Sequence, residues 1–155
     1  MESEKTLAGK AETITHINRV RHYISLMLAE LEKRSLNHDK SKLESPEKEI
    51  FGEVSGELAK TKYGSPEYHA LLDKLGPALD HHYANNRHHP QFWKDGISDM
   101  TLIDLVEMLC DWKAATERMN NGNIRKSIEH NTTRFNISPQ LAKIMDNTVR
   151  EMFRD

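Results

Sequence analysis

Cysteine is almost absent from this chain, which has only Cys110 among its 155 residues. A disulfide framework within the chain is therefore excluded, and so is a zinc site built from four cysteines. Long apolar runs are missing as well, because no stretch approaches the roughly 18 consecutive apolar residues of a membrane span. Residues 1–11 are polar and lack the apolar segment of a secretory signal. We therefore expect a cytoplasmic protein with no membrane partner.

The sequence also lacks a strong excess of charge of either sign. Lys and Arg total 22 and Asp and Glu total 24, which gives a formal net charge of −2. Non-specific nucleic-acid binding depends on neutralising phosphates with surplus Lys and Arg. We therefore do not expect nucleic acid as a partner, whereas self-association into a homo-oligomer remains open.

Apolar residues recur at helical spacing along most of the chain, and no run alternates with the period of a strand. Ile17, Val20, Ile24 and Leu31 predict a long helix from residue 12 to about residue 33. Further helices are expected over residues 46–61, 67–75, 78–86, 100–119, 124–130 and 140–153, separated by Ser-Pro, Gly-Pro and Asn-Gly turn signals. We predict an all-α, single-domain bundle of six to eight helices over residues 12–155, preceded by a disordered lead-in over residues 1–11.

Histidine is abundant, with nine residues in the chain and four of them between His81 and His89. In chain order, the residues able to bind a metal are His16, His38, Asp39, His81, His82, His88, His89 and Asp111. Neutral imidazole and carboxylate suit Mn, Fe, Co, Ni or Zn. A site of these ligands without thiolate favours a catalytic metal over a structural one.

Helical phase favours some of these candidates over others. Leu75, Leu79, His82 and Asn86 share one stripe, which begins apolar and ends in polar side chains. Asp111 lies in an apolar part of its expected helix, where a carboxylate is costly unless it is paired or bound to a metal. Taken singly, each residue is also explained as a structural or surface residue. Only their joint order along the chain favours a metal site.

That order resembles the HD-domain superfamily of metal-dependent phosphohydrolases. In its pattern, a His on one helix is followed by a His-Asp pair, by further His residues and by a distant Asp. The matching residues are His16, His38, Asp39, His82, His88, His89 and Asp111. Residues 38–42 also resemble the His-Asp-x-Gly-Lys run of the cyclic-di-nucleotide phosphodiesterase branch, but Ser41 replaces the glycine and the Gly-Tyr-Pro signature of that branch is absent.

Over most of its length, the chain is further similar to a family of small phage and bacterial proteins with no established activity. The stretches that carry this similarity are residues 81–83, 86–90 and 100–118. This second resemblance is the more specific of the two, and it implies no reaction.

The HD resemblance implies an HD-like helical domain with one or two divalent transition metals per chain. The first metal would be held by His16, His38, Asp39 and Asp111, and Asp39 would bridge to a second metal completed by His82 and by His88 or His89. The implied reaction is hydrolysis of a nucleotide or another small phosphorylated substrate by a metal-activated hydroxide. Asp39, Lys42 and Arg87 would be catalytic, and Lys42, Arg87 and Arg118 would bind the substrate phosphate.

Other interpretations remain open at this point. Lys42, Arg87 and Arg118 are equally well explained as solvated surface charges. Some HD-type proteins with a di-iron centre are oxygenases, and the additional histidines are compatible with that chemistry. A non-catalytic phage factor that binds a nucleotide or a host protein is a third hypothesis.

Overall fold

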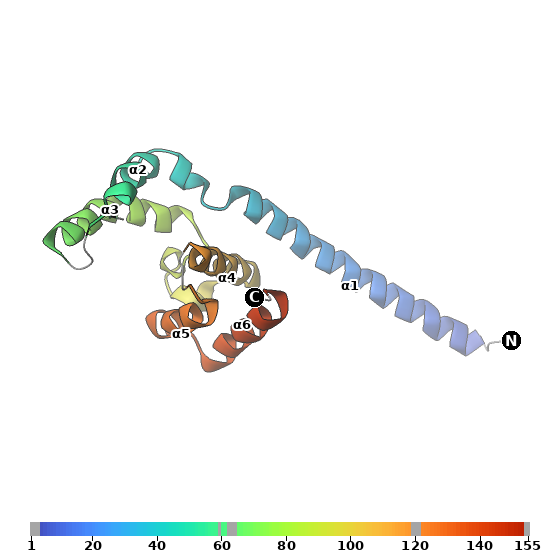
Figure 1. The fold of residues 1–155 in the computed structure, drawn as a ribbon. Coiled ribbons are helices and arrows are strands. Elements are labelled where there is room, and N and C mark those ends of the chain that lie inside the picture. The colour runs from blue at the N-terminus through green and yellow to red at the C-terminus, as the bar shows by residue number, and fades with distance from the viewer. Residues whose placement is uncertain (1–3, 59, 62–64, 119–121, 154–155) are drawn as a thin grey trace. The chain divides into compact units, whose positions relative to one another are not determined.

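The structure is a computed structural model that describes residues 4–58, 60–61, 65–118 and 122–153. Within these ranges it is all-helical, which confirms the predicted fold class (Figure 1). The α-helices are α1 (Glu4–Asn37), α2 (Glu47–Leu58), α3 (Pro66–Asn85), α4 (Leu102–Glu117), α5 (Ile124–Arg134) and α6 (Pro139–Met152). Three short 3-10 helices join them: η1 (Lys40–Leu43), η2 (Pro90–Phe92) and η3 (Gly96–Asp99). No described helix is long and apolar enough to cross a membrane.

The chain divides into two compact units, Met1–Asn37 and His38–Asp155. The first unit consists of α1, which has no buried residue along its described length. Residues 4–11, which we expected in a disordered lead-in, belong to this helix. Their sequence is mostly Glu, Lys, Leu and Ala, and adding such residues to an existing helix costs little free energy. The second unit contains α2–α6 and has two hydrophobic cores.

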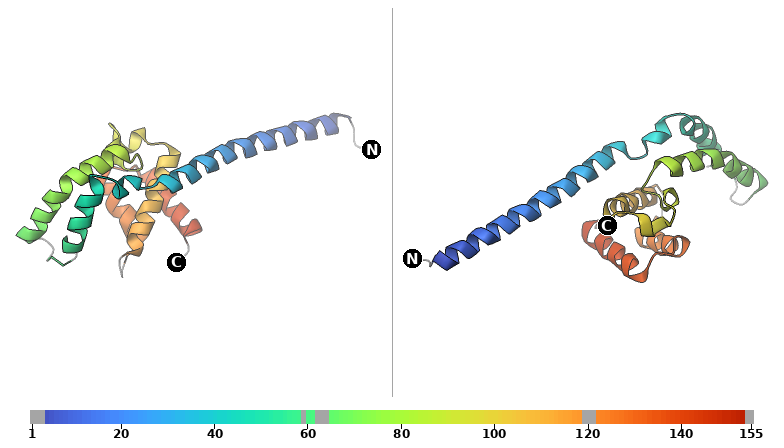
Figure 2. Two further views of the ribbon diagram at one scale, coloured as in Figure 1. Left: turned by 90° about the horizontal axis from the view of Figure 1, so that it is seen from above. Right: turned by 180° about the vertical axis from the view of Figure 1, so that it is seen from behind.

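The first core lies between α2 and α3, which run side by side in all the views of Figures 1 and 2. Val54 on α2 packs with Leu71 and Leu75 on α3. The predicted break at Gly76-Pro77 was wrong, because α3 continues through Pro77. Proline removes one helical hydrogen bond, but the buried face of α3 keeps its phase from Leu75 to Ala78. Packing therefore outweighs the local turn signal.

The second core is shared by α4, α5 and α6. Its buried members are Met108, Leu109, Trp112, Ile124, Ile128, Ile137, Met145 and Val149. Side chains at the N-caps determine where these helices begin: Thr101 and Asp104 form a capping box on α4, Asn123 caps α5 and Ser138 caps α6. The helix expected from residue 100 therefore begins two residues later, and Ser98 and Asp99, which precede it, lie in η3. The capping box gives α4, which carries Asp111, a defined start.

Candidate metal centre

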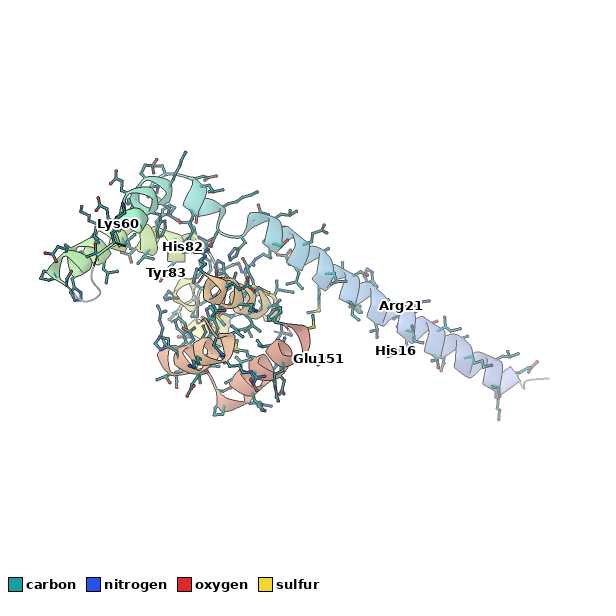
Figure 3. All side chains as sticks on the ribbon, in the orientation of Figure 1. His16, Arg21, Lys60, His82, Tyr83 and Glu151 are labelled. Carbon is teal, nitrogen blue, oxygen red and sulfur yellow. The ribbon has the colours of Figure 1, made fainter. Side chains whose placement is uncertain are left out.

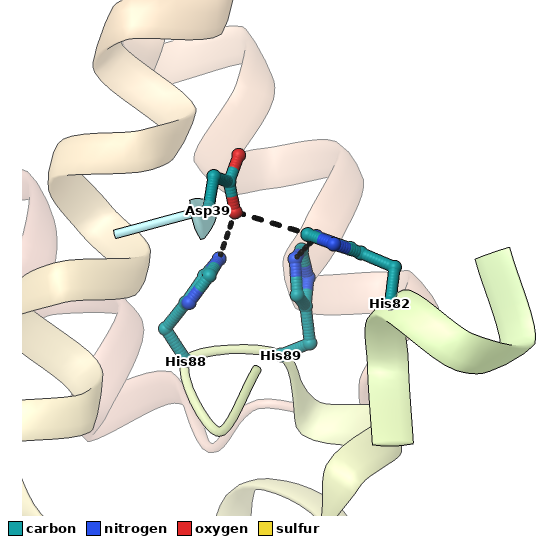
Figure 4. Close-up of side chains that lie close together, drawn as sticks. All are labelled: Asp39, His82, His88 and His89. Atoms are coloured by element: carbon teal, nitrogen blue, oxygen red, sulfur yellow. Dashed lines mark hydrogen bonds and ion pairs between the residues drawn. The ribbon is translucent and has the colours of Figure 1, made fainter. Parts of the chain in front are cut away.

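Four side chains from three segments of the second unit converge on one point (Figure 4). Asp39 immediately precedes η1 and has a left-handed backbone with φ of 54°, a conformation that aspartate tolerates better than most residues. His82 lies in the last turn of α3, and His88 and His89 lie in the loop before η2. One potential ligand atom from each of the four residues lies within 4.8 Å of all the others.

One oxygen of Asp39 is at the centre of this group. Its Oδ1 atom lies 3.4 Å from His82 Nε2 and 3.5 Å from His88 Nε2. His82 Nε2 also lies 2.9 Å from His89 Nε2. The Nε2 atoms of His82 and His88 therefore both face Asp39 Oδ1, and both histidines are almost fully buried (Figure 4).

Two atoms of this group are buried without any hydrogen-bond partner among the described residues. They are Asp39 Oδ1 and His88 Nε2. Burying an unsatisfied polar atom costs roughly 1–3 kcal/mol, so each such atom in a folded protein needs an explanation. A divalent cation accepts a carboxylate oxygen and an imidazole nitrogen as ligands, and it would satisfy both atoms at once. The residues therefore fit a metal.

A second group lies on the other side of the same carboxylate. His38 Nε2 lies 3.6 Å from Asp39 Oδ2 and 3.7 Å from Asp111 Oδ1, and these three residues also offer converging ligand atoms. Lys42 Nζ donates a hydrogen bond of 2.6 Å to Asp39 Oδ2. The two oxygens of Asp39 thus face two different sets of candidate ligands.

The surroundings shift the protonation equilibria of these groups. The adjacent carboxylate of Asp111, followed by the hydrogen bond to Glu107, raises the pKa of His38 to about 10. Burial lowers the pKa of His89 to about 3, and the neighbouring rings of His88 and His82 act in the same direction. Burial also lowers the pKa of His82. His82 and His89 are therefore neutral at pH 7, which is the form that binds a metal.

Both aspartates of the site have a pKa below its ordinary value. Burial acts in the opposite direction on each of them, but it is outweighed by the hydrogen bond from Lys42 to Asp39 and by the proximity of His38 to Asp111. The two carboxylates are therefore ionised at neutral pH. In this structure, the positive charges of Lys42 and His38 balance them.

Two glutamates, Glu47 and Glu107, contact the histidines of the site, and neither was predicted from the sequence. Glu47, at the start of α2, is 0% exposed and lies 2.7 Å from His81 Nδ1 and 2.9 Å from His82 Nδ1. Glu107, on α4, lies 2.9 Å from His38 Nδ1. A signal for Glu107 was present, because it lies one turn before Asp111 on the same helix. Glu47 gave no signal, because a glutamate in the first turn is ordinarily explained by the helix dipole.

The remaining predicted residues lie elsewhere. His16 is exposed on α1, in the first unit, and it belongs to none of the three groups of potential ligands found among the described residues (Figure 3). Arg87 donates two hydrogen bonds to the buried carboxylate of Asp104. Arg118 is exposed at the C-cap of α4. A metal-binding role for His16 and substrate-binding roles for the two arginines stay predictions.

Comparison with known proteins gives a family but no activity. A family model described as "Family of unknown function (DUF5662)" matches residues 5–151. No curated protein matches the chain, and no solved structure matches it.

Proposed function

The chain belongs to the DUF5662 family of unknown function, and we propose that it is a divalent-metal-dependent phosphohydrolase acting on a nucleotide or another small phosphoester. The observation that carries this proposal is the pair of unsatisfied buried atoms, Asp39 Oδ1 and His88 Nε2, among converging imidazoles. A ligand set of His and Asp without Cys is typical of catalytic metal centres.

The proposed ligands form two sets that share Asp39. One set is Asp39, His82, His88 and His89, and the other is His38, Asp39 and Asp111. Mn, Fe, Co, Ni or Zn held by such ligands would lower the pKa of a bound water and would polarise a phosphoryl oxygen. The contribution of the protein is to keep His82 and His89 neutral and the two aspartates ionised, and to bury His82 and His88.

Lys42 is the residue we assign to the phosphoryl group. Its ammonium lies beside Asp39 and 5.8 Å from the centre of the Phe51 ring, and its side chain is 38% exposed. It can therefore reach both the site and a ligand that enters from solvent. A positive charge there would stabilise the negative charge that develops on phosphoryl oxygens during hydrolysis. Arg87 has no part in this proposal, because its guanidinium pairs with Asp104.

The test is a hydrolysis screen on the full-length protein. Metal-free protein is supplied with Mn²⁺, Co²⁺, Ni²⁺, Fe²⁺ or Zn²⁺ and offered p-nitrophenyl phosphate, bis-p-nitrophenyl phosphate and nucleoside mono-, di- and triphosphates. We expect metal-dependent release of phosphate or nitrophenol from at least one substrate. Asp39→Asn should lower kcat/KM at least about 100-fold, because it removes the shared charged ligand. Asp73→Asn, at an exposed position of α3, is the matched control and should leave the rate unchanged.

Two results would contradict the proposal. One is full activity of Asp39→Asn at unchanged metal content. The other is a metal-loaded protein that hydrolyses none of the substrates. If the iron-loaded protein consumed oxygen and released no phosphate, the assignment would move to an oxygenase.

A further inference from the structure

Glu47 and Glu107 each contact two imidazoles through the same ring atom, Nδ1. Glu47 contacts His81 and His82 in this way. Glu107 Oε1 contacts His38 at 2.9 Å and His88 at 3.2 Å. An ionised carboxylate can only accept hydrogen bonds, so the Nδ1 atom carries the proton in each of these contacts. Asn86 Nδ2 also lies 3.0 Å from His82 Nδ1, but its two hydrogens are donated to Ser41 Oγ and to the carbonyl oxygen of His82.

This arrangement determines which ring nitrogen is left to bind a metal. When a carboxylate holds the proton on Nδ1, the lone pair of the neutral imidazole is on Nε2. The Nε2 atoms of His82, His88 and His38 lie 3.4, 3.5 and 3.6 Å from the carboxylate of Asp39. The glutamates therefore direct the Nε2 atoms of all three rings towards the shared aspartate, and His38, which is protonated in this structure, would lose its Nε2 proton on binding a metal. Metal-binding histidines are commonly oriented by a carboxylate on the opposite nitrogen.

The two glutamates differ in how many metal positions they reach. The partners of Glu107 include a member of each proposed set, because His38 is grouped with Asp39 and Asp111, and His88 with Asp39, His82 and His89. A third group of converging atoms joins His38 and His88 to Glu107 itself. The partners of Glu47 include only one proposed ligand, His82, since His81 belongs to neither set. We propose that Glu107 is a positioning residue for both metal positions and that Glu47 is a positioning residue for one. This inference rests on the metal centre of the proposed function.

Glu47 is itself held by neighbouring polar groups. Ser41 Oγ donates to Glu47 Oε2 at 3.0 Å, and Asn86 Nδ2 donates to Ser41 Oγ at 2.7 Å. Ser41 stands where the His-Asp-x-Gly-Lys run has its glycine. The Ser41 hydroxyl therefore supports the Glu47 carboxylate, which contacts His82 Nδ1.

The test is a titration of the metal-free, full-length protein with Co²⁺ alone, followed by calorimetry and by the visible absorption of bound cobalt. The wild-type protein should bind two ions. Glu107→Met, which removes the acceptor oxygens, should weaken both binding steps about 10- to 100-fold. Glu47→Met should weaken one step to this extent and leave the other within about 2-fold, with the cobalt spectrum of the second position unchanged. Glu107→Gln retains an acceptor oxygen and should lie between Glu107→Met and the wild-type protein.

Matched controls come from exposed glutamates on the same helices. Glu53→Met on α2 and Glu117→Met on α4 should bind both ions as the wild-type protein does. Equal weakening of both steps by Glu47→Met would overturn the inference, as would unchanged binding in Glu107→Met.

A second measurement covers the case in which a glutamate variant does not fold. In the Zn²⁺-loaded wild-type protein, nitrogen NMR of the imidazole rings should find Nδ1 protonated and Nε2 bound to metal in His38, His82 and His88. Binding through Nδ1 in any of the three would overturn the inference. A wild-type protein that binds one Co²⁺ would overturn it while leaving a metal centre in place, whereas a wild-type protein that binds none would remove the proposed function itself.

Discussion

Arg87 and His88 are neighbours in the sequence, but they belong to different networks. The guanidinium of Arg87 donates to both oxygens of Asp104 at 2.8 and 3.0 Å and lies 4.8 Å from the centre of the Trp93 ring. Asp104 is 0% exposed and also forms the capping box with Thr101. Arg87 therefore stabilises the start of α4, whereas His88 faces the candidate metal centre.

Replacing Arg87 tests this structural role. Arg87→Ala leaves the buried Asp104 carboxylate without its charged partner, so we expect the free energy of unfolding to fall by about 3 kcal/mol. Arg118→Ala, at an exposed position, should change it by less than about 0.5 kcal/mol. Urea denaturation followed by circular dichroism measures both. A stable Arg87→Ala protein that loses hydrolysis would instead assign Arg87 to catalysis.

The sequence predicted some of the proposed ligands. His38, Asp39, His82 and Asp111 were predicted from their order along the chain, with helical phase as a further argument for His82 and Asp111, and the structure places each of them in a group of converging potential ligand atoms. The ion pair of Arg87 with Asp104 could not be predicted from the sequence, because the residues around Arg87 do not indicate that its partner is a buried carboxylate 17 residues later. Side-chain partners that are distant in sequence depend on tertiary packing, which local pattern does not contain.

Helix α3 is the element in which local signals and packing disagree. Gly76 and Pro77 form a strong turn signal, yet the helix runs from Pro66 to Asn85 through both. Its continuity matters for the site, because His82 lies in the same helix as the residues that pack against α2. The break was predicted from Gly76 and Pro77 alone, whereas the continuity of α3 depends on all the buried residues along its length.

Gly76→Ala should stabilise the protein by about 0.5–1 kcal/mol, because alanine reduces the backbone freedom of the unfolded chain and favours helix. Apart from the chain neighbours and the backbone of α3 itself, a Cβ atom at this position meets no heavy atom within 4 Å. Gly96→Ala is the contrasting control. Gly96 has φ of +58°, and alanine there should lower the free energy of unfolding by about 1 kcal/mol. Thermal denaturation of both variants measures the two shifts, and a destabilised Gly76→Ala protein would contradict this account of α3.

At the scale of the whole molecule, the candidate centre joins segments that are far apart in the chain. Asp39 precedes η1, His82 ends α3, and Asp111 lies in α4. The sequence predicted the helical class and the order of these residues, and the structure brings them together within the second unit. The sequence could not predict that Glu47 and Glu107 contact the Nδ1 atoms of the histidines, because these contacts depend on how α2 and α4 pack around the site.

Elemental analysis of the purified full-length protein is the most direct test of whether these residues bind a divalent metal. The protein should be purified without chelators or affinity metals and equilibrated with a mixture of Mn, Fe, Co, Ni and Zn ions before desalting. We expect about one to two transition-metal ions per chain, held by imidazole and carboxylate ligands. A folded protein that retains no metal under these conditions would contradict the account.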